Sequence, residues 1–210
     1  MKPISILLAE DNQLFTDIWT HVFNTDGRFK VIGSCSEPME VHKYALALNP
    51  SILLIDMHAE QGNYFGVIRR VLASGYSGNM IVLAINAMPL VAKRLFSLGI
   101  KGYITKNCSI DEMMEAIEEV HAGNIYLEKN ILELLHKKEM LSTGDERWQL
   151  LSSREVEVVY AVREGLTSKE IALLLDITMK TVEVHRNNIM RKLGVRNTAA
   201  LVNLTYAKGI

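Results

Sequence analysis

The chain has 210 residues, of which 49% are hydrophobic and 22% are charged, and its formal net charge is −1 at pH 7. This composition is typical of a folded globular protein and excludes a disordered chain. The sequence has no apolar run as long as a membrane span or a signal-peptide core, so we expect a cytoplasmic protein with no membrane partner.

The charge is distributed unevenly along the chain. Residues 1–125 carry ten basic and thirteen acidic side chains, whereas residues 149–210 carry nine basic and six acidic ones. This asymmetry favours two domains with different partners, the second of them a polyanion. An ordinary solvated surface of mixed charge can have the same balance, so the charge alone does not identify the partner.

Short apolar runs alternate with segments of helical periodicity over the first part of the chain. The expected strands are residues 4–9, 29–33, 51–55, 80–85 and 102–104, and the expected helices are residues 12–24, 37–48, 64–73, 89–98 and 110–122. Several of the strands are continuous apolar runs, which is typical of strands covered on both faces. Five repeats of strand and helix predict a doubly wound α/β domain with a parallel five-stranded sheet in the order 2-1-3-4-5.

The rest of the chain is predicted to be helical. Residues 123–148 form a linker, within which residues 128–139 are expected to be a helix. The expected helices beyond it are residues 153–164, 168–175, 181–193 and 197–207, with a turn at 176–180. We therefore expect three parts: a first domain at 1–122, the linker at 123–148, and an all-α domain of four helices at 149–210.

Charged side chains lie at the carboxyl ends of three expected strands. Glu10 and Asp11 follow the first strand, Asp56 follows the third, and Lys106 follows the fifth. In a doubly wound sheet these ends meet at one edge, so the three carboxylates should converge. Such a cluster requires a neutralising cation, and Mg²⁺ accepts this donor set. Asp56 could then attack a phosphoryl group, whereas the alternative is that these carboxylates only cap helices.

These residues lie in three segments, Ala9–Asn12, Leu53–Met57 and Gly102–Asn107. In this order the segments resemble a response-regulator receiver domain, which has the flavodoxin-like (CheY-like) fold, over residues 3–122. The resemblance implies Asp56 as phosphoacceptor and a histidine kinase as phosphodonor. The implied site residues are the Mg²⁺ ligands Glu10, Asp11, Asp56 and the backbone carbonyl of His58, the phosphate contact Lys106 and the aromatic switch residue Tyr103.

Two departures from the receiver pattern affect the expected switch. Ala84 occupies the position at the end of the fourth strand where the family normally has Ser or Thr, and it cannot donate a hydrogen bond to an aspartyl phosphate. Glu60 adds an anion to the loop after Asp56. We therefore expect phosphorylation of Asp56 to shift the conformational equilibrium only weakly.

The helices at 168–175 and 181–193, joined by a tight turn, have the pattern of a helix-turn-helix. Apolar residues define an inward face: Ile171, Ala172 and Leu175 on the first helix, and Val182, Ile189 and Leu193 on the second. The outward face of the second helix is rich in amide and charged side chains, which suits base edges and phosphates. A plain helical bundle with one polar face fits the same periodicity.

The segments 151–158, 165–172, 181–185 and 192–195 resemble the LuxR-type DNA-binding domain. Together with the receiver, this resembles the NarL/FixJ class of response regulators, which bind double-stranded DNA. The resemblance implies base-proximal roles for Glu183, Val184 and Asn187. It implies phosphate contacts from Lys169, Lys180, Thr181, His185, Arg191 and Lys192.

The same resemblance implies a homodimer. The helix at 197–207 is expected to dimerise on DNA, and residues 89–122 are expected to form a dimer or interdomain face. Position 183 departs from the family, which usually has Lys there; Glu183 opposes phosphates but can accept from a cytosine amino group.

Three functional classes remain after these observations. The first is a two-component response regulator that regulates transcription and is not an enzyme beyond its own aspartyl phosphorylation and dephosphorylation. The second, favoured by Ala84, is a pseudo-receiver transcription factor with weak or no phospho-switching. The third is a Mg²⁺-dependent phosphatase whose acidic pocket turns over a substrate.

Overall fold

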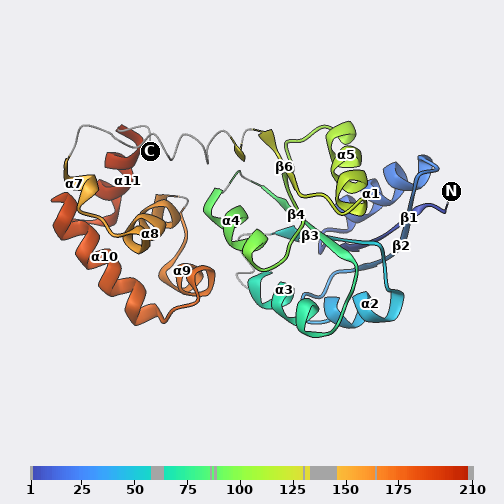
Figure 1. Cartoon of the computed structure of the whole chain (residues 1–210), viewed down its shortest axis with the longest axis horizontal. Coiled ribbons are helices and arrows are strands. Elements are labelled where there is room, and N and C mark those ends of the chain that lie inside the picture. Colours follow the sequence, from blue (N-terminus) through green and yellow to red (C-terminus); the bar gives the residue numbers. More distant parts are fainter. Residues whose placement is uncertain are drawn as a thin grey trace. The chain divides into compact units, whose positions relative to one another are not determined.

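The computed structural model describes residues 2–57, 64–85, 87, 89–129, 131–132, 146–163 and 165–207. The chain divides into two compact units, one of Met1–Ala87 and Leu95–Glu128, the other of Met88–Arg94 and Lys129–Ile210 (Figure 1). Within the described ranges, no helix combines the length and the apolar character needed to cross a membrane.

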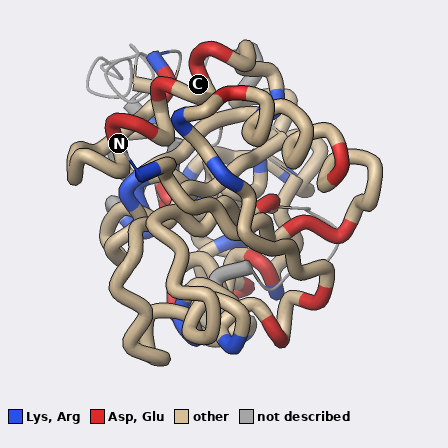
Figure 2. Tube along the Cα trace, turned by 90° about the vertical axis from the view of Figure 1, so that its right-hand side faces the viewer, with Lys and Arg blue, Asp and Glu red and all other residues tan. Residues whose placement is uncertain are grey.

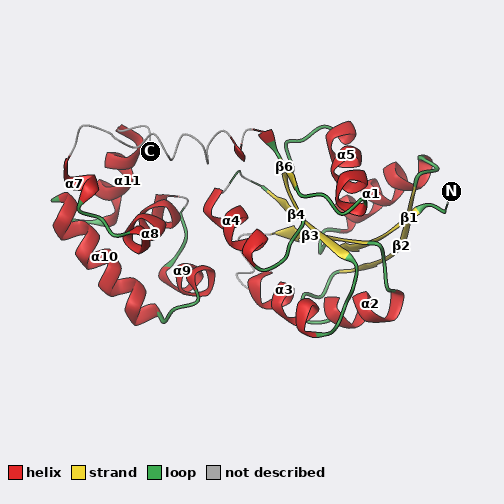
Figure 3. Ribbon diagram, viewed as in Figure 1, coloured by secondary structure: helices red, strands yellow, loops and turns green. Residues whose placement is uncertain are grey.

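The first unit is built around one parallel sheet with helices on both faces (Figure 3). Its strands are β1 (Ile4–Ala9), β2 (Phe29–Cys35), β3 (Ile52–Met57), β4 (Asn79–Ala84), β5 (Gly102–Thr105) and β6 (Tyr126–Leu127). Its helices are α1 (Gln13–Thr25), α2 (Val41–Leu48), α3 (Tyr64–Ala73), α4 (Pro89–Ser97), which crosses the division between the units, and α5 (Ile110–His121). The sheet order is β2-β1-β3-β4-β5-β6, so the expected doubly wound fold and the order of its first five strands are confirmed.

The sheet core explains why the strands are continuous apolar runs. On one face, α1 and α5 pack against alternate strand residues, with Phe23 and Ile117 among the buried contacts (Figure 1). The helices α2 and α3 lie on the opposite face. Because both faces are covered, Leu7, Leu53 and Val82 are as fully buried as their strand neighbours.

The sixth strand was not expected from the sequence. Tyr126 and Leu127 pair in parallel with Gly102 and Tyr103 of β5. The Glu128 carboxylate then accepts two hydrogen bonds from Thr105, one from its backbone N–H (2.7 Å) and one from its hydroxyl (3.2 Å). A strand of two residues carries no detectable periodicity, which is why it was missed.

Helix α2 also begins later than the expected residue 37. Pro38 lies in a turn in which the Glu40 N–H donates to the Glu37 carbonyl at 2.9 Å, and the helix starts at Val41. Proline disfavours helical geometry in the residue before it, so Glu37 stays outside the helix.

The second unit is all helical. It contains α7 (Glu146–Gln149), α8 (Ser153–Arg163), α9 (Ser168–Leu175), α10 (Met179–Leu193) and α11 (Thr198–Ala207). The short α7 was not predicted as a helix, and the expected linker helix at 128–139 lies mostly outside the described residues. The expected inward faces are confirmed by burial, since Ile171, Ala172, Leu175, Val182, Ile189 and Leu193 are all buried.

The turn between α9 and α10 is shorter than predicted. Asp176 ends α9 in the left-handed conformation, with φ of 56°, and Thr178 caps α10 by accepting from the Thr181 N–H at 3.1 Å. The helix therefore begins at Met179 rather than at residue 181, and Lys180 lies in its first turn. A threonine cap is the local signal that the sequence analysis overlooked.

Candidate metal centre and nucleic-acid interface

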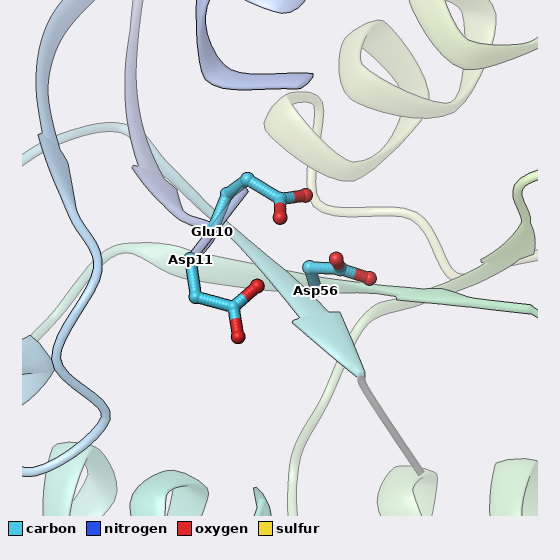
Figure 4. Close-up of side chains that lie close together, drawn as sticks. All are labelled: Glu10, Asp11 and Asp56. Carbon is cyan, nitrogen blue, oxygen red and sulfur yellow. The ribbon is translucent and has the colours of Figure 1, made fainter. Parts of the chain in front are cut away.

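Three carboxylates meet at the carboxyl edge of the sheet (Figure 4). Glu10 and Asp11 directly follow β1, and Asp56 is the penultimate residue of β3. The two strands are neighbours and Ala9 pairs with Ile55, so the residues that follow them reach the same level. One carboxylate oxygen from each of the three residues lies within 4.8 Å of the others. The structure thus brings together the three acidic residues that the sequence placed at this edge.

Lys106 supplies positive charge to this cluster from the end of β5. Its backbone N–H donates to the Ala84 carbonyl at 2.7 Å, which fixes the residue beside β4. Its Nζ atom is 2.6 Å from Asp56 Oδ2 and 3.9 Å from Glu10 Oε2. The Asp56 side chain is only 3% exposed and that of Lys106 only 16%, so this ion pair is poorly screened by water.

The ring of Phe15, from the first turn of α1, lies 4.6 Å from Lys106 Nζ. An aromatic face attracts an ammonium group, and the ring also restricts the directions that the lysine side chain can take. No motif in the sequence marks Phe15, and its place in the first turn of the helix after Asp11 and Asn12 is the only local signal of this contact.

One ammonium group does not balance three carboxylates. Burial, reinforced by a hydrogen bond and repulsion from Asp56, raises the pKa of Glu10 to about 7, although the Asn12 N–H and Lys106 act in the opposite direction. A carboxylate that is buried beside another carboxylate is costly to ionise, and a bound cation would relieve this cost. The donor set consists of carboxylate oxygens, which hard divalent cations such as Mg²⁺ prefer, so the residues present fit a Mg²⁺ ion.

The expected switch residues are both buried. Ala84 is 2% exposed at the end of β4 and pairs with Thr105, and Tyr103 is fully buried in β5. The methyl group of Ala84 offers no hydrogen-bond donor to the pocket. His58 and Glu60 lie outside the described residues, so their predicted places near Asp56 stay predictions.

The outward face of α10 carries most of the residues expected to contact DNA. Glu183, Val184, Asn187 and Arg191 are exposed on it, and Thr181 and His185 are half-buried beside them. Lys169 on α9 and Lys180 on α10 are also exposed. An exposed helix with amide, carboxylate and guanidinium groups can present hydrogen-bonding atoms to base edges and phosphates.

Basic and acidic positions are interspersed along the trace in the view of Figure 2. Neither sign of charge predominates in this view.

Lys192 differs from the other expected phosphate contacts. Its Nζ atom lies 2.6 Å from Glu155 Oε2, and the Glu155 side chain is only 4% exposed. The same carboxylate oxygen accepts from the Ser152 N–H at 2.7 Å. Burial opposes ionisation of Glu155, but Lys192 and Ser152 together hold its pKa below the ordinary value. The ammonium of Lys192 therefore ties the end of α10 to the start of α8.

Comparison with known families identifies both units. Residues 6–118, more than half of the chain, match the response regulator receiver domain. The chain belongs to the response regulators. Residues 149–205 match the bacterial regulatory proteins of the luxR family, so this response regulator combines a receiver domain with a LuxR-type DNA-binding domain.

Two relatives align with nearly the whole response regulator. The nitrate/nitrite response regulator protein NarP of Escherichia coli K12 is 23% identical over 94% of this chain and 92% of its own length. The oxygen regulatory protein NreC of Staphylococcus aureus RF122 is 26% identical over 98% of both chains.

Solved structures of RcsB share the fold. One is RcsB of Salmonella enterica serovar Typhimurium bound to promoter rprA with phosphomimetic BeF3−. Its TM-score to the response regulator is 0.65 at 24% identity, covering 96% of this chain and 97% of that one. A structure of two RcsB dimers on two parallel DNAs has a TM-score of 0.61 at 22% identity, with the same coverage.

The pairing of Lys192 with Glu155 generates a stability prediction. Lys192→Ala is expected to lower the free energy of unfolding by about 1–3 kcal/mol, because Glu155 keeps a buried carboxylate without its ammonium partner. Urea unfolding followed by circular dichroism measures this change. Lys169→Ala, at an exposed position on α9, is the matched control and should change stability by less than ~0.5 kcal/mol. Unchanged unfolding of Lys192→Ala together with several-fold weaker DNA binding would contradict the structural role of Lys192.

Proposed function

We propose that this response regulator accepts a phosphoryl group on Asp56 from a histidine kinase and binds double-stranded DNA as a homodimer to regulate transcription. The receiver domain is assigned to residues 1–122, the linker to 123–148 and the DNA-binding domain to 149–210. The observation that carries the proposal is the convergence of the Glu10, Asp11 and Asp56 carboxylates, with the Lys106 ammonium against Asp56 and Glu10.

The pocket has the parts that phosphoryl transfer to a carboxylate requires. An oxygen of Asp56 attacks the phosphorus of a phosphohistidine, the new O–P bond forms, and the P–N bond breaks with its electron pair returning to the imidazole. Lys106, whose Nζ atom is 2.6 Å from Asp56 Oδ2, would neutralise the oxygens of the incoming phosphoryl group. Mg²⁺, held by Glu10, Asp11, Asp56 and the backbone carbonyl of His58, would supply further charge neutralisation when bound.

We propose that phosphorylation of Asp56 shifts the conformational equilibrium only weakly. A hydrogen bond from a serine or threonine hydroxyl to a charged phosphate contributes about 1.5–3 kcal/mol, and Ala84 cannot make it. This observation also favours the second candidate function, a pseudo-receiver in which the first domain serves mainly for docking or dimerisation.

Phosphorylation of Asp56 and its effect on DNA binding and dimerisation can be tested separately. Acetyl phosphate with Mg²⁺ should add one phosphoryl group to the wild-type chain, measured as intact mass, and Asp56→Asn should lack it. Beryllofluoride with Mg²⁺ should raise DNA affinity and the dimer fraction by less than about threefold, which corresponds to under ~1 kcal/mol.

Asp17→Asn, at an exposed position on α1, serves as the control and should behave as the wild type. Failure of the wild type to gain the adduct would support the pseudo-receiver instead. A large gain in both affinity and dimer fraction that depends on Asp56 would contradict weak coupling.

The DNA-binding part of the proposal places α10 in the major groove. Glu183, Val184 and Asn187 would face base edges there. The proposed phosphate contacts are Lys169, Lys180, Thr181, His185 and Arg191, while Lys192 would stabilise the helix that carries them. A homodimer, with α11 as its contact on DNA, would place two such helices about 34 Å apart or a multiple of that distance. The RcsB dimers on DNA support this arrangement.

Reversal of the charge at position 183 tests the groove assignment. Glu183→Lys is expected to tighten binding to all duplexes, to steepen the dependence of log K on log salt by about one unit, and to reduce the preference among sequences. Fluorescence anisotropy at several salt concentrations measures these changes. Asp17→Lys introduces the same charge change on α1 and is expected to leave the slope unchanged. Loss of binding to every sequence in Glu183→Lys would show that α10 does not face the groove as proposed.

A further inference from the structure

A chain of hydrogen bonds crosses three helices of the DNA-binding domain and ends at Glu183. Arg186 on α10 donates from one terminal nitrogen to the Thr198 hydroxyl of α11 at 2.7 Å. Its other terminal nitrogen donates to the Ser168 hydroxyl oxygen of α9 at 3.0 Å. The Ser168 hydroxyl in turn bonds to Oε1 of Glu183 on α10.

The direction of these bonds is determined by the chemistry of the groups. A guanidinium only donates, so Arg186 must donate to the oxygen of Ser168. A hydroxyl has one proton, and a carboxylate only accepts, so the Ser168 proton must point to Glu183. The relay therefore runs one way, from Arg186 through Ser168 to Glu183.

The anchors of this relay are fixed by local structure. Ser168 is the first residue of α9, and Thr167 before it forms a capping box with Glu170. Thr198 is the first residue of α11. Because both hydroxyls belong to helix starts, the carboxylate of an otherwise exposed side chain is held in one place. A carboxylate has about four lone-pair positions and Ser168 occupies one of them, which leaves acceptor capacity toward a ligand.

We propose that Ser168 and Arg186 are positioning residues for sequence readout, which hold Glu183 as an acceptor for the major-groove amino group of a cytosine. This inference rests on the proposed binding of DNA through α10. A carboxylate that moves freely beside phosphates is repelled from the groove, whereas one held by a hydroxyl keeps its acceptor atoms at a fixed position. Cytosine N4 is the base-edge donor that a carboxylate accepts from.

If Ser168 and Arg186 position Glu183, removing either should reduce the preference for one base and should not lower the affinity for all DNA. Full-length wild-type protein is used to select its best site from a randomised duplex pool, and each position of that site is then changed to the other bases. At one cytosine we expect a preference of about tenfold, within the range of a good base contact. In Ser168→Ala this preference should fall below about threefold, while affinity for unrelated duplex DNA changes less than twofold.

Two variants serve as controls, and a third repeats the test at Arg186. Ser168→Thr keeps the hydroxyl and should retain the preference within about twofold. Lys169→Ala removes the neighbouring phosphate contact and should weaken binding to all sequences equally. Arg186→Lys keeps the charge but lacks the two terminal nitrogens of the guanidinium, and it should lose the preference at the same cytosine as Ser168→Ala. It provides a second test if Ser168→Ala fails to fold, which thermal unfolding of each variant would show.

The outcomes separate this inference from the proposed function. A preference that is lost in Glu183→Gln but retained in Ser168→Ala and Arg186→Lys would overturn the positioning role. A wild-type site without a cytosine preference that depends on Glu183 would overturn the readout, although DNA binding itself would stand. Failure of the wild type to bind duplex DNA would overturn both. Loss of the same preference in Ser168→Ala, Arg186→Lys and Glu183→Gln, with rescue by Ser168→Thr, is the result that supports it.

Discussion

Carboxylates gathered at one edge of a sheet need positive charge beside them, and in this response regulator the Lys106 ammonium, paired with Asp56, supplies it. The pair joins the ends of β3 and β5, strands that are not neighbours in the sheet. It therefore depends on β4 lying between them in the sheet. Three carboxylates beside one ammonium group leave a set of oxygen donors that suits a divalent cation.

The surroundings of this ion pair determine how strongly chemistry at Asp56 can affect the rest of the chain. Ala84 removes the hydroxyl that would respond to a phosphate, and Tyr103 is already fully buried. Thr105, the residue before Lys106, is bound to Glu128, where the chain leaves the sheet. The end of β5 is thus bonded to Glu128, the residue that follows β6, while the side chain of Ala84 offers the pocket no hydrogen bond.

Much of the fold and of the acidic pocket could be predicted from the sequence. The apolar runs of the strands and the carboxylates at their ends are visible in the local sequence. Because parallel strands end at one edge of the sheet, the fold brings these carboxylates into one site. What could not be predicted depends on contacts between distant residues. β6 is defined by pairing alone, Phe15 is placed by its approach to Lys106, and the bond from Lys192 to Glu155 depends on helix packing. The relay to Glu183 is also of this kind, since Ser168 and Arg186 meet only in the folded domain.

We expect Glu10, Asp11 and Asp56 to share one cation beside Lys106. Isothermal titration of Mg²⁺ into the full-length chain tests it most directly, with Asp11→Asn as the variant and Asp17→Asn as the matched control. One bound ion is expected in the wild type and in Asp17→Asn, and at least tenfold weaker binding is expected in Asp11→Asn. Equal Mg²⁺ affinity in all three proteins, or no binding to the wild type, would contradict it.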